Sequence, residues 1–592
     1  MKTDNVCNRT FRELFTGPLR YEIPFFQRGY AWEKKQWDQL FEDITEQILP
    51  DVDDGTPLGD VEHFFGPIVV LQRKDTDPSV LRYLVIDGQQ RITTVYLLLS
   101  IIKEHLEQLQ HKAGDATTHA LILRNLLSNE PVTGDDYERL KLYSSKGDRL
   151  PTYRALFGKA QNPRSPFYYT DVDLYQPGNN QVDEFVKYVE KKLRTNFKDV
   201  PSLWQLAGVL LDSLRIVWIP LDGDKDDPQA IFESLNDKGM PLASSELICS
   251  YLFKPLESVP DFEQLHNREW LGTIREFAKQ SDFEEYLRYL FSIGSSKMVG
   301  KGRKIYVHFK NRNPRLNVAT ARYRLAEIHE NAKYYKMISA PAENRHSNPE
   351  IAALLESISA TRMDASTPFL LDVLRAQGSD SIPSSTAIGL LSETLTLLVR
   401  RKMTENPTTI YDTLFPRLFA SIAYEASPIR AFQEQIRAAG VWTSDQEFVD
   451  SMVNRTLYRT RDLPFTRMIL MELDKTMQSF GQLPDYSTVP TIEHVIPQTL
   501  DPSWEAYLGE DVESLDFYTK INSIGNLCLL SQPANSSAGQ NPFTSKVRDY
   551  SEITALAREL KSFDSDWNLA AVEDRSRRLA ERARGRWAWS NV

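Results

Sequence analysis

Four polar residues near the C-terminal end of the chain have the types and order needed to hydrolyse a phosphodiester bond. Glu493 and His494 are adjacent, and Asn526 and Asn535 follow them. His494 is the only histidine after His346, and imidazole is suited to activating a water at neutral pH. Carboxylate and amide oxygens suit Mg²⁺ or Mn²⁺, so Glu493 and Asn535 are the expected metal ligands. The sequence therefore predicts metal-assisted hydrolysis with His494 as the base.

The elements around these residues must bring them together. Glu493 and His494 would face opposite sides of an extended strand, so a bend is needed, and Pro497 with the loop after it offers one. We expect Asn526, in a second strand, to orient the imidazole through a backbone or side-chain hydrogen bond. Asn535 then opens the next element. The alternative is that His494 is a structural histidine and that residues 524–530 form a core strand.

The spacing of these residues resembles that of the HNH endonuclease superfamily, with Glu-His in the first strand, Asn in the second and Asn or His at a helix. It is more closely similar to the C-terminal nuclease domain of GmrSD-type modification-dependent restriction systems. The matching segments are 493–497 (EHVIP), 524–530 (IGNLCLL), Asn535 and 543–546 (FTSK). One departure from many HNH enzymes is Asn535, where those enzymes have histidine. The resemblance implies that Lys546 is a phosphate contact or a transition-state cation.

A second polar motif lies near the N-terminus, among aromatic and apolar residues. Residues 87–91 (DGQQR) follow the apolar run 81–86 and precede a helix expected over 92–105. Helix N–H groups and the helix dipole favour an anion at such a turn, and arginine adds bidentate phosphate contacts. The alternative is a capped helix start in which Arg91 pairs with a buried carboxylate.

Residues 23–32 (IPFFQRGYAW), 87–94 (DGQQRITT) and 231–242 (IFESLNDKGMPL) resemble the ParB/sulfiredoxin-like domain that precedes the nuclease in GmrSD-type proteins. The resemblance implies that a nucleoside triphosphate (GTP, UTP or ATP) is bound and hydrolysed to gate DNA cleavage. It also implies recognition of modified DNA. The chain has no Walker A sequence, so a P-loop mechanism is not expected. The expected nucleotide-binding residues are Gln27, Arg28, Tyr30, Asp87, Gly88, Gln89, Gln90, Arg91, Thr93 and Asn236.

Length and composition indicate an ordinary globular protein of two to four domains. The chain has 592 residues, of which 41% are hydrophobic and 26% charged. Its three cysteines are isolated, and no apolar run is long enough for a membrane span, so we expect a cytoplasmic protein. The predicted fold is α+β multidomain. It comprises a ParB/sulfiredoxin-like α/β domain over 1–255, a helical scaffold or linker over 256–480, and a ββα-metal (HNH) domain over 481–592. In the first domain we expect strands at 64–71, 81–86 and 213–220.

Two basic segments stand out against the formal net charge of −11, which argues against coating nucleic acid over the whole surface. One is the segment 295–324, expected to be a loop, and the other is a C-terminal helix expected over 571–583. Each is either a phosphate-binding face or a solvated one. The candidate DNA contacts are Lys301, Arg303, Lys304, Arg577 and Arg578.

The leading hypothesis is a nucleotide-regulated, modification-dependent DNA endonuclease acting in anti-phage defence, with double-stranded DNA and a nucleoside triphosphate as partners and no membrane. Whether it acts as a monomer or a homo-oligomer is left open. Three alternatives remain. They are a phosphorothioate-sensing NTPase and nicking nuclease, an NTP-switched DNA-binding protein with an inactive nuclease site, and a nuclease acting on RNA.

Overall fold

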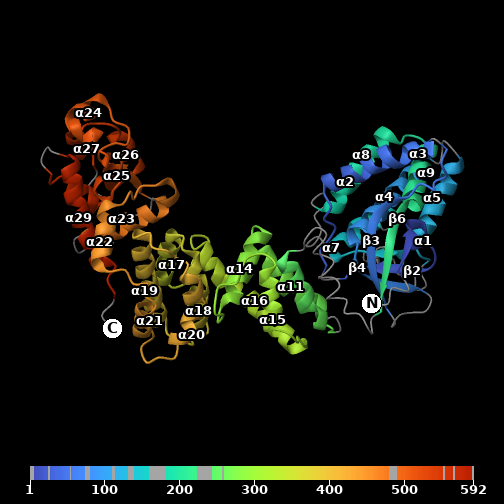
Figure 1. Ribbon diagram of the computed structural model, residues 1–592, viewed down its shortest axis with the longest axis horizontal. Helices are drawn as coiled ribbons and strands as arrows, with labels where there is room; N and C mark the ends of the chain where they lie inside the picture. The colour runs from blue at the N-terminus through green and yellow to red at the C-terminus, as the bar shows by residue number, and fades with distance from the viewer. Residues whose placement is uncertain are drawn as a thin grey trace. The chain divides into compact units, whose positions relative to one another are not determined.

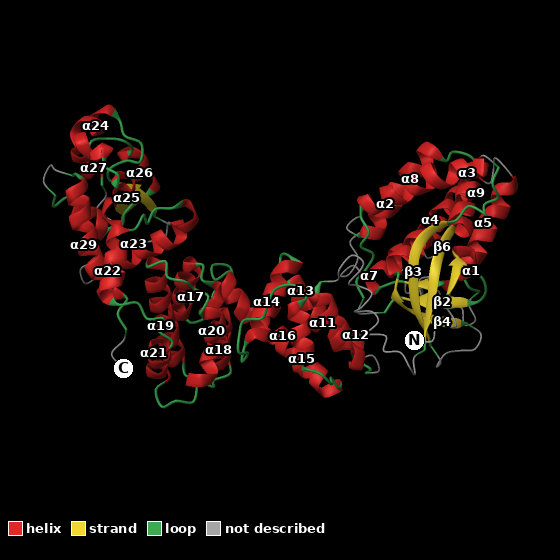
Figure 2. Cartoon of the chain, viewed as in Figure 1, coloured by secondary structure: helices red, strands yellow, loops and turns green. Residues whose placement is uncertain are grey.

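The computed structural model describes residues 6–24, 27–53, 55–73, 80–109, 114–130, 139–158, 180–222, 243–256, 259–478, 490–550, 554–563 and 567–589. The chain divides into two compact units, residues 1–257 and 258–592 (Figure 1). Helices predominate, and the strands form one mixed sheet in the first unit and one strand pair in the second (Figure 2). The α+β prediction is confirmed at this level. Among the described residues, no helix is long and apolar enough to cross a membrane.

The first unit is built on a six-stranded sheet in the order β1-β6-β3-β4-β2-β5. The β1–β6 and β3–β4 pairs are antiparallel, whereas the other neighbours are parallel. The three predicted strands are confirmed as β3, β4 and β6, because their β-branched and apolar runs pack well on a pleated surface. The strands are β1 Cys7–Thr10, β2 Leu19–Glu22, β3 His63–Gln72, β4 Leu81–Asp87, β5 Leu142–Tyr143 and β6 Leu214–Leu221.

Helix α4, Gln89–Leu109, forms much of the core of this unit. Its residues 92–103 are all buried, and it contacts β3 and the helices α5, α7, α8 and α9. The predicted helix is therefore confirmed, with three additional residues at its start and four at its end. The other helices are α1 Phe11–Phe15, α2 Lys34–Glu42, α3 Leu49–Asp53, α5 Gly114–Leu127, α7 Lys146–Phe157, α8 Gln181–Asn196, α9 Val200–Gly208 and α11 Ser244–Phe253.

Gly88 makes the turn between β4 and α4 with φ +88°. A Cβ atom at this position would lie 2.8 Å from the carbonyl oxygen of Pro67. Both the backbone conformation and the close approach require glycine. The turn therefore fixes where the first residues of α4 lie.

The second unit begins with helices, as predicted for the middle of the chain. The segment 295–324 was expected to be a loop, and that expectation is wrong for much of it. Apolar side chains at helical spacing, Ile305, Tyr306 and Phe309, are buried and hold Lys304–Arg312 in a helix. The helices are α12 Phe262–Gln264, α13 Gly272–Arg275, α14 Gln280–Ser292, α15 Lys304–Arg312, α16 Val318–Ser339, α17 Pro349–Thr361, α18 Thr367–Gly378, α19 Ser384–Met403, α20 Tyr411–Ile422, α21 Pro428–Ala438, α22 Asp445–Asn454 and α23 Leu463–Met477.

The C-terminal part of this unit contains an antiparallel strand pair, β7 and β8, among short helices. Its last helix, α29, confirms the predicted C-terminal helix. The elements are β7 Thr491–His494, α24 Pro502–Leu508, α25 Phe517–Ile521, β8 Leu527–Leu530, α26 Gln532–Ala538, α27 Phe543–Asp549, α28 Ala555–Leu560 and α29 Leu569–Arg586.

A fully buried arginine links the helices to the end of the chain. Arg400, near the end of α19, donates to the carbonyl oxygens of Thr443 and Trp587 and pairs with Asp445. Because an unpaired buried guanidinium is costly, these contacts hold the C-terminal elements against the helices. The predicted boundary at residue 480 lies inside this compact unit, and it stays a prediction.

Candidate functional sites

The β7–β8 pair places Glu493 opposite Cys528 and His494 opposite Leu527. Adjacent residues of a strand point to opposite faces, and the burial of the two side chains differs accordingly. Glu493 is only 5% exposed, whereas His494 is half-buried. The strand therefore places the imidazole on the opposite face from the buried carboxylate.

The imidazole of His494 is oriented by Asn522. Its Nε2 lies 3.1 Å from Oδ1 of Asn522, and Gln498 donates to the same oxygen at 2.7 Å. Because the amide nitrogen of Asn522 donates to the carbonyl oxygen of Tyr518, Oδ1 is the accepting atom. Nε2 therefore carries the ring proton, and Nδ1 holds the lone pair.

The protonation state of His494 suits a base. Its pKa is lowered to about 4, chiefly by burial and also by the charge of Lys546, while the hydrogen bond with Asn522 acts in the opposite direction. The ring is consequently neutral at physiological pH. A neutral imidazole with a free lone pair accepts a proton from water.

Asn526 contacts the loop after His494, whereas we expected it to orient the ring. It is fully buried, and its Oδ1 accepts from the backbone N–H of Ile496 while its amide donates to the carbonyl oxygens of Ile496 and Ile521. Its own carbonyl oxygen accepts from Val495. Asn526 thus fixes the backbone that follows the histidine, and the ring contact comes from Asn522, which the motif did not identify.

Lys546 is fully buried and lies against Glu493. Its Nζ is 2.7 Å from Oε1 of Glu493 and 2.8 Å from the carbonyl oxygen of His494. Tyr550 donates to the same carboxylate oxygen at 3.4 Å. Burial raises the pKa of Glu493, although Lys546 and Tyr550 lower it. The lysine expected to contact phosphate therefore neutralises a buried carboxylate in this arrangement.

Asn535, in α26, faces β7. Its amide nitrogen donates to the hydroxyl of Thr491 at 2.9 Å and to the carbonyl oxygen of Ile492 at 3.2 Å. Both bonds use the nitrogen, so the amide oxygen is the atom of this side chain suited to a cation. The described residues contain no group of three or more His, Cys, Asp or Glu side chains able to hold a metal. Carboxylate and amide oxygens are ligand types that a magnesium-like ion accepts, and such an ion usually keeps several waters.

The N-terminal motif joins two segments of the first unit. Gln90 accepts from the backbone N–H of Ala31 and donates to the carbonyl oxygen of Gly29. The hydroxyl of Tyr30 lies 2.7 Å from that of Thr94 and accepts from Trp37. Gln90 and Tyr30, both expected to bind nucleotide, therefore hold segment 27–31 against α4.

Asp148 is a further member of this site that the sequence did not indicate. It is buried and accepts from the backbone N–H of Tyr30 at 2.6 Å, from Ser145 and from Asn180. Burial raises its pKa, and these hydrogen bonds lower it. Gly29 packs so closely that a Cβ there would lie 2.9 Å from the carboxylate.

Three of the expected nucleotide-binding residues have buried polar atoms without a hydrogen-bond partner in the described structure. These atoms are Oε1 of Gln27, Nε of Arg28 and Oε1 of Gln89. Gln27 is otherwise anchored through its amide nitrogen, which donates to the carbonyl oxygens of Val85 and Ile86. Buried polar groups are rarely left unpaired, so a polar ligand is a natural partner for them.

The remaining expected ligands differ in their surroundings. Arg91 packs against Gly66 and donates to the carbonyl oxygen of Pro67 at 3.3 Å. Burial lowers its pKa, and the charge of Asp87 raises it. Thr93 is buried within α4, and Asn236 lies outside the described residues.

The candidate DNA-binding arginines of α29 have acidic neighbours. Arg577 pairs with Glu573 at 2.7 Å, and Arg578 pairs with Asp574 at 3.3 Å. In the other basic segment, Lys301 lies 3.7 Å from Glu285, and Arg303 and Lys304 stand at the start of α15. Local carboxylates reduce the potential of both faces, and their role in DNA binding stays a prediction.

Two family models match the chain in the order expected from these sites. The N-terminal domain of GmrSD restriction endonucleases matches residues 11–253, which include the DGQQR turn. The C-terminal domain of GmrSD restriction endonucleases matches residues 442–582, which include β7, β8 and α29. No curated protein matches the chain. The chain belongs to the GmrSD family of restriction endonucleases, enzymes of defence against modified DNA.

Proposed function

We propose that this protein cleaves modified double-stranded DNA with a divalent metal ion, under the control of a nucleoside triphosphate. The observation that carries the proposal is the state of His494. Its Nε2 is bound to Asn522, its pKa is lowered to about 4, and its Nδ1 holds a lone pair at neutral pH. This is the state required of a general base that activates a water.

The proposed metal ligands are Glu493 and Asn535. Oε1 of Glu493 is 2.7 Å from Nζ of Lys546, and the carboxylate is the acidic oxygen ligand that this strand offers to a cation. A Mg²⁺ or Mn²⁺ held there would polarise the phosphate and stabilise the leaving oxygen. The chain itself supplies the proton acceptor at Nδ1 of His494. Lys546 favours the ionised form of Glu493, and Asn526 fixes the loop behind the base.

The proposed nucleotide site lies at the turn between β4 and α4. Gln27, Arg28 and Gln89 supply the unpartnered polar atoms, and the start of α4 supplies N–H groups favourable to phosphate. Asp87 and Arg91 flank the turn. GTP, UTP and ATP all present a triphosphate of the required chemistry, so the base preference is left to experiment.

The decisive experiment is a cleavage assay on three DNAs, namely unmodified plasmid, phage DNA with glucosylated hydroxymethylcytosine, and phosphorothioated plasmid. Each is incubated with Mg²⁺ or Mn²⁺, with and without GTP, UTP or ATP, and EDTA should abolish cutting. Cleavage confined to the glucosylated DNA supports the proposal. Cleavage that depends on phosphorothioate selects the phosphorothioate-sensing alternative, and nucleotide turnover without cleavage of any DNA selects the switch with an inactive nuclease.

A further inference from the structure

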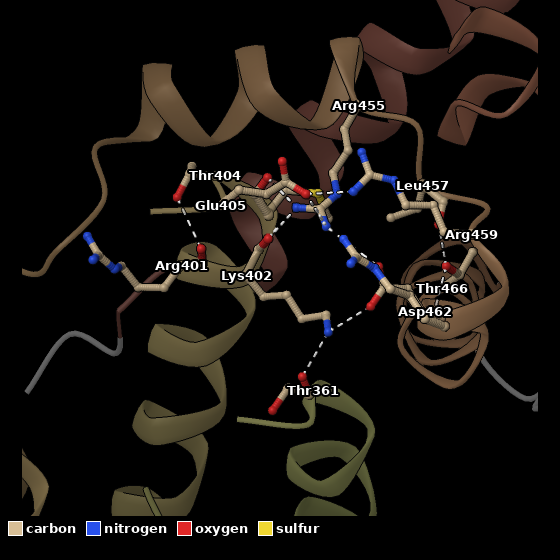
Figure 3. Close-up of polar contacts among 12 residues, drawn as sticks. Thr361, Arg401, Lys402, Thr404, Glu405, Arg455, Leu457, Arg459, Asp462 and Thr466 are labelled. Carbon is tan, nitrogen blue, oxygen red and sulfur yellow. Dashed lines mark hydrogen bonds and ion pairs between the residues drawn. The ribbon is translucent and has the colours of Figure 1, made fainter. Parts of the chain in front are cut away.

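The loop between α22 and α23, residues 455–462, lies beside the nuclease site although it precedes β7 by about thirty residues in the sequence. We call it the arginine loop, because it contains Arg455, Arg459 and Arg461. Figure 3 shows the loop and the end of α19 joined by polar contacts. Its side chains are therefore held by the helices of the second unit.

The arginine loop contacts the two residues that form the base. The backbone N–H groups of Leu457 and Tyr458 both donate to the carbonyl oxygen of Asn522, at 2.9 and 3.1 Å. The ring of Tyr458 meets that of His494 edge to face, with centroids 4.4 Å apart. Arg459 directly follows Tyr458, the residue that packs against His494. Consecutive Cα atoms are about 3.8 Å apart, so the backbone of Arg459 lies close to the nuclease site.

Two cations of this cluster are structural. Arg455 donates to the carbonyl oxygens of Lys402 and Met403 at the end of α19. Lys402 donates to the carbonyl oxygen of Thr361 and pairs with Asp462 at 3.0 Å (Figure 3). Both side chains are largely buried. They hold the loop in place and add positive potential behind it.

The other two cations reach solvent. The side chain of Arg461 is 75% exposed and that of Arg459 is 32% exposed. Arg459 pairs with Glu405 at 2.7 Å, and Glu405 is itself 54% exposed (Figure 3). Glu405 also pairs with the largely buried Arg455 at 3.2 Å. Its pair with Arg459 is partly exposed, and exposed ion pairs contribute only about 0–1 kcal/mol, so a phosphate can take its place at Arg459 while Glu405 stays with Arg455. Arginine is well suited to this exchange, because it binds phosphate through two parallel hydrogen bonds.

We propose that Arg459 and Arg461 bind the phosphate backbone of the DNA next to the bond that is cut, and that Glu405 competes with this phosphate for Arg459. The inference rests on the proposed nuclease function. It extends the DNA-binding surface to a loop that lies before the nuclease motif. The three arginines of the loop, together with Arg401 and Lys402, outnumber the carboxylates of Glu405 and Asp462, so an anion is attracted to this position.

The test measures DNA binding across a range of salt concentrations, in the full chain carrying His494→Ala so that no cleavage occurs. The double variant Arg459→Gln/Arg461→Gln should lower the slope of log affinity against log salt by about 2, since each phosphate contact contributes roughly 0.9. The matched control is Arg345→Gln/Arg430→Gln, which removes two exposed arginines elsewhere in the second unit. An arginine-loop variant that behaves like this control overturns the inference.

Glu405→Gln should change DNA affinity in the opposite direction from the arginine variant, and misfolding cannot raise the affinity. Removing the competing carboxylate should tighten DNA binding and leave nucleotide turnover unchanged. Weaker or unaltered binding contradicts the competition between Glu405 and phosphate. Failure of the wild-type protein to cut any of the three DNAs would instead count against the proposed function itself.

Discussion

The two motif sites of this protein differ in how completely their polar groups are paired. In the nuclease site, His494, Asn526 and Lys546 each have hydrogen-bond partners from other parts of the chain. In the N-terminal site, Arg28 and Gln89 each have a buried polar atom without a partner among the described residues. Among the described residues, the polar groups of the nuclease site are therefore paired more completely than those of the N-terminal site.

This difference fits a division of labour between the two sites. An unpaired buried polar group costs about 1–3 kcal/mol, and a ligand that pairs it recovers this free energy as binding affinity. A preassembled catalytic site needs no such ligand to order its side chains. This contrast supports the proposal that the N-terminal site binds a regulatory nucleotide and that the C-terminal site carries out the cleavage.

The largest expected effect comes from removing the base. His494→Ala should lower the rate of DNA cleavage by about 10²–10⁴-fold, the usual contribution of a general base, and leave nucleotide turnover unchanged. Gel assays of DNA cutting and phosphate-release assays measure the two activities separately. His329→Ala, which removes a histidine bonded to Thr273 in the same unit, is the control and should behave like the wild type. An equal loss of DNA cleavage in both variants would contradict the assignment of His494 as the general base.

A second variant examines how the fold sets the pKa of this base. Because the pKa of His494 is about 4, wild-type cleavage should persist at mildly acidic pH and fall as the pH approaches 4. Asn522→Asp places a carboxylate beside Nε2, stabilises the charged ring and so raises its pKa. The acid side of the pH–rate profile should therefore move upward by about 1–2 pH units.

The control for this variant is Asn541→Asp. Asn541 also donates to a carbonyl oxygen four residues earlier, but it has no contact with His494 among those the structure describes. Its pH–rate profile should match that of the wild type. An unchanged profile in Asn522→Asp would show that Asn522 does not act through the histidine.

Substitutions at two neighbouring glutamines, Gln89 and Gln90, test the N-terminal site. Gln89→Ala removes an atom that has no hydrogen-bond partner among the described residues, and it should weaken nucleotide turnover about tenfold while leaving the melting temperature unchanged. Gln90→Ala breaks two hydrogen bonds to segment 29–31 and should lower the free energy of unfolding by about 1–2 kcal/mol. Thermal unfolding and turnover are measured on both variants. Loss of stability in Gln89→Ala would contradict the contrast between the two sites.

The smallest expected effect concerns stability at acidic pH. The pKa of His494 is about 4 in the fold and about 6.5 when unfolded, so between these values the unfolded state binds more protons. The stability that comes from the neutral ring is present above pH 6.5 and is lost as the pH falls toward 4. Wild-type protein should lose about 1–2 kcal/mol more than His494→Ala over this range in thermal unfolding. A parallel loss in both would indicate that the ring is not buried in the neutral state.

Local patterns in the sequence were sufficient for much of the fold. The runs at β3, β4 and β6 and the apolar helix α4 are determined by their own composition, and the structure confirms them. The segment 295–324 was wrongly predicted to be a loop, because the prediction rested on its many cations. The helical spacing of Ile305, Tyr306 and Phe309, which are buried, determines the helix instead. Charge density thus outweighed periodicity in the prediction, whereas packing follows periodicity.

Contacts between distant segments could not be predicted in the same way. The motif indicated His494 but not Asn522, because that contact depends on how the loop after β7 folds back. Asp148 escaped notice for the same reason, since it meets Tyr30 from a helix more than a hundred residues away. A motif identifies the residue types that do chemistry, whereas the partners that tune them come from tertiary structure.

The bond between the arginine loop and Asn522 has a consequence for protein engineering. A nuclease module excised at residue 480 would lose Leu457 and Tyr458, whose backbone N–H groups hold the carbonyl oxygen of Asn522. A fusion point at residue 258, where the second compact unit begins, would keep both of these residues with the nuclease site. Chimaeras joined there would keep the nuclease site together with Leu457 and Tyr458. Those joined at residue 480 would carry the nuclease motif without these two residues.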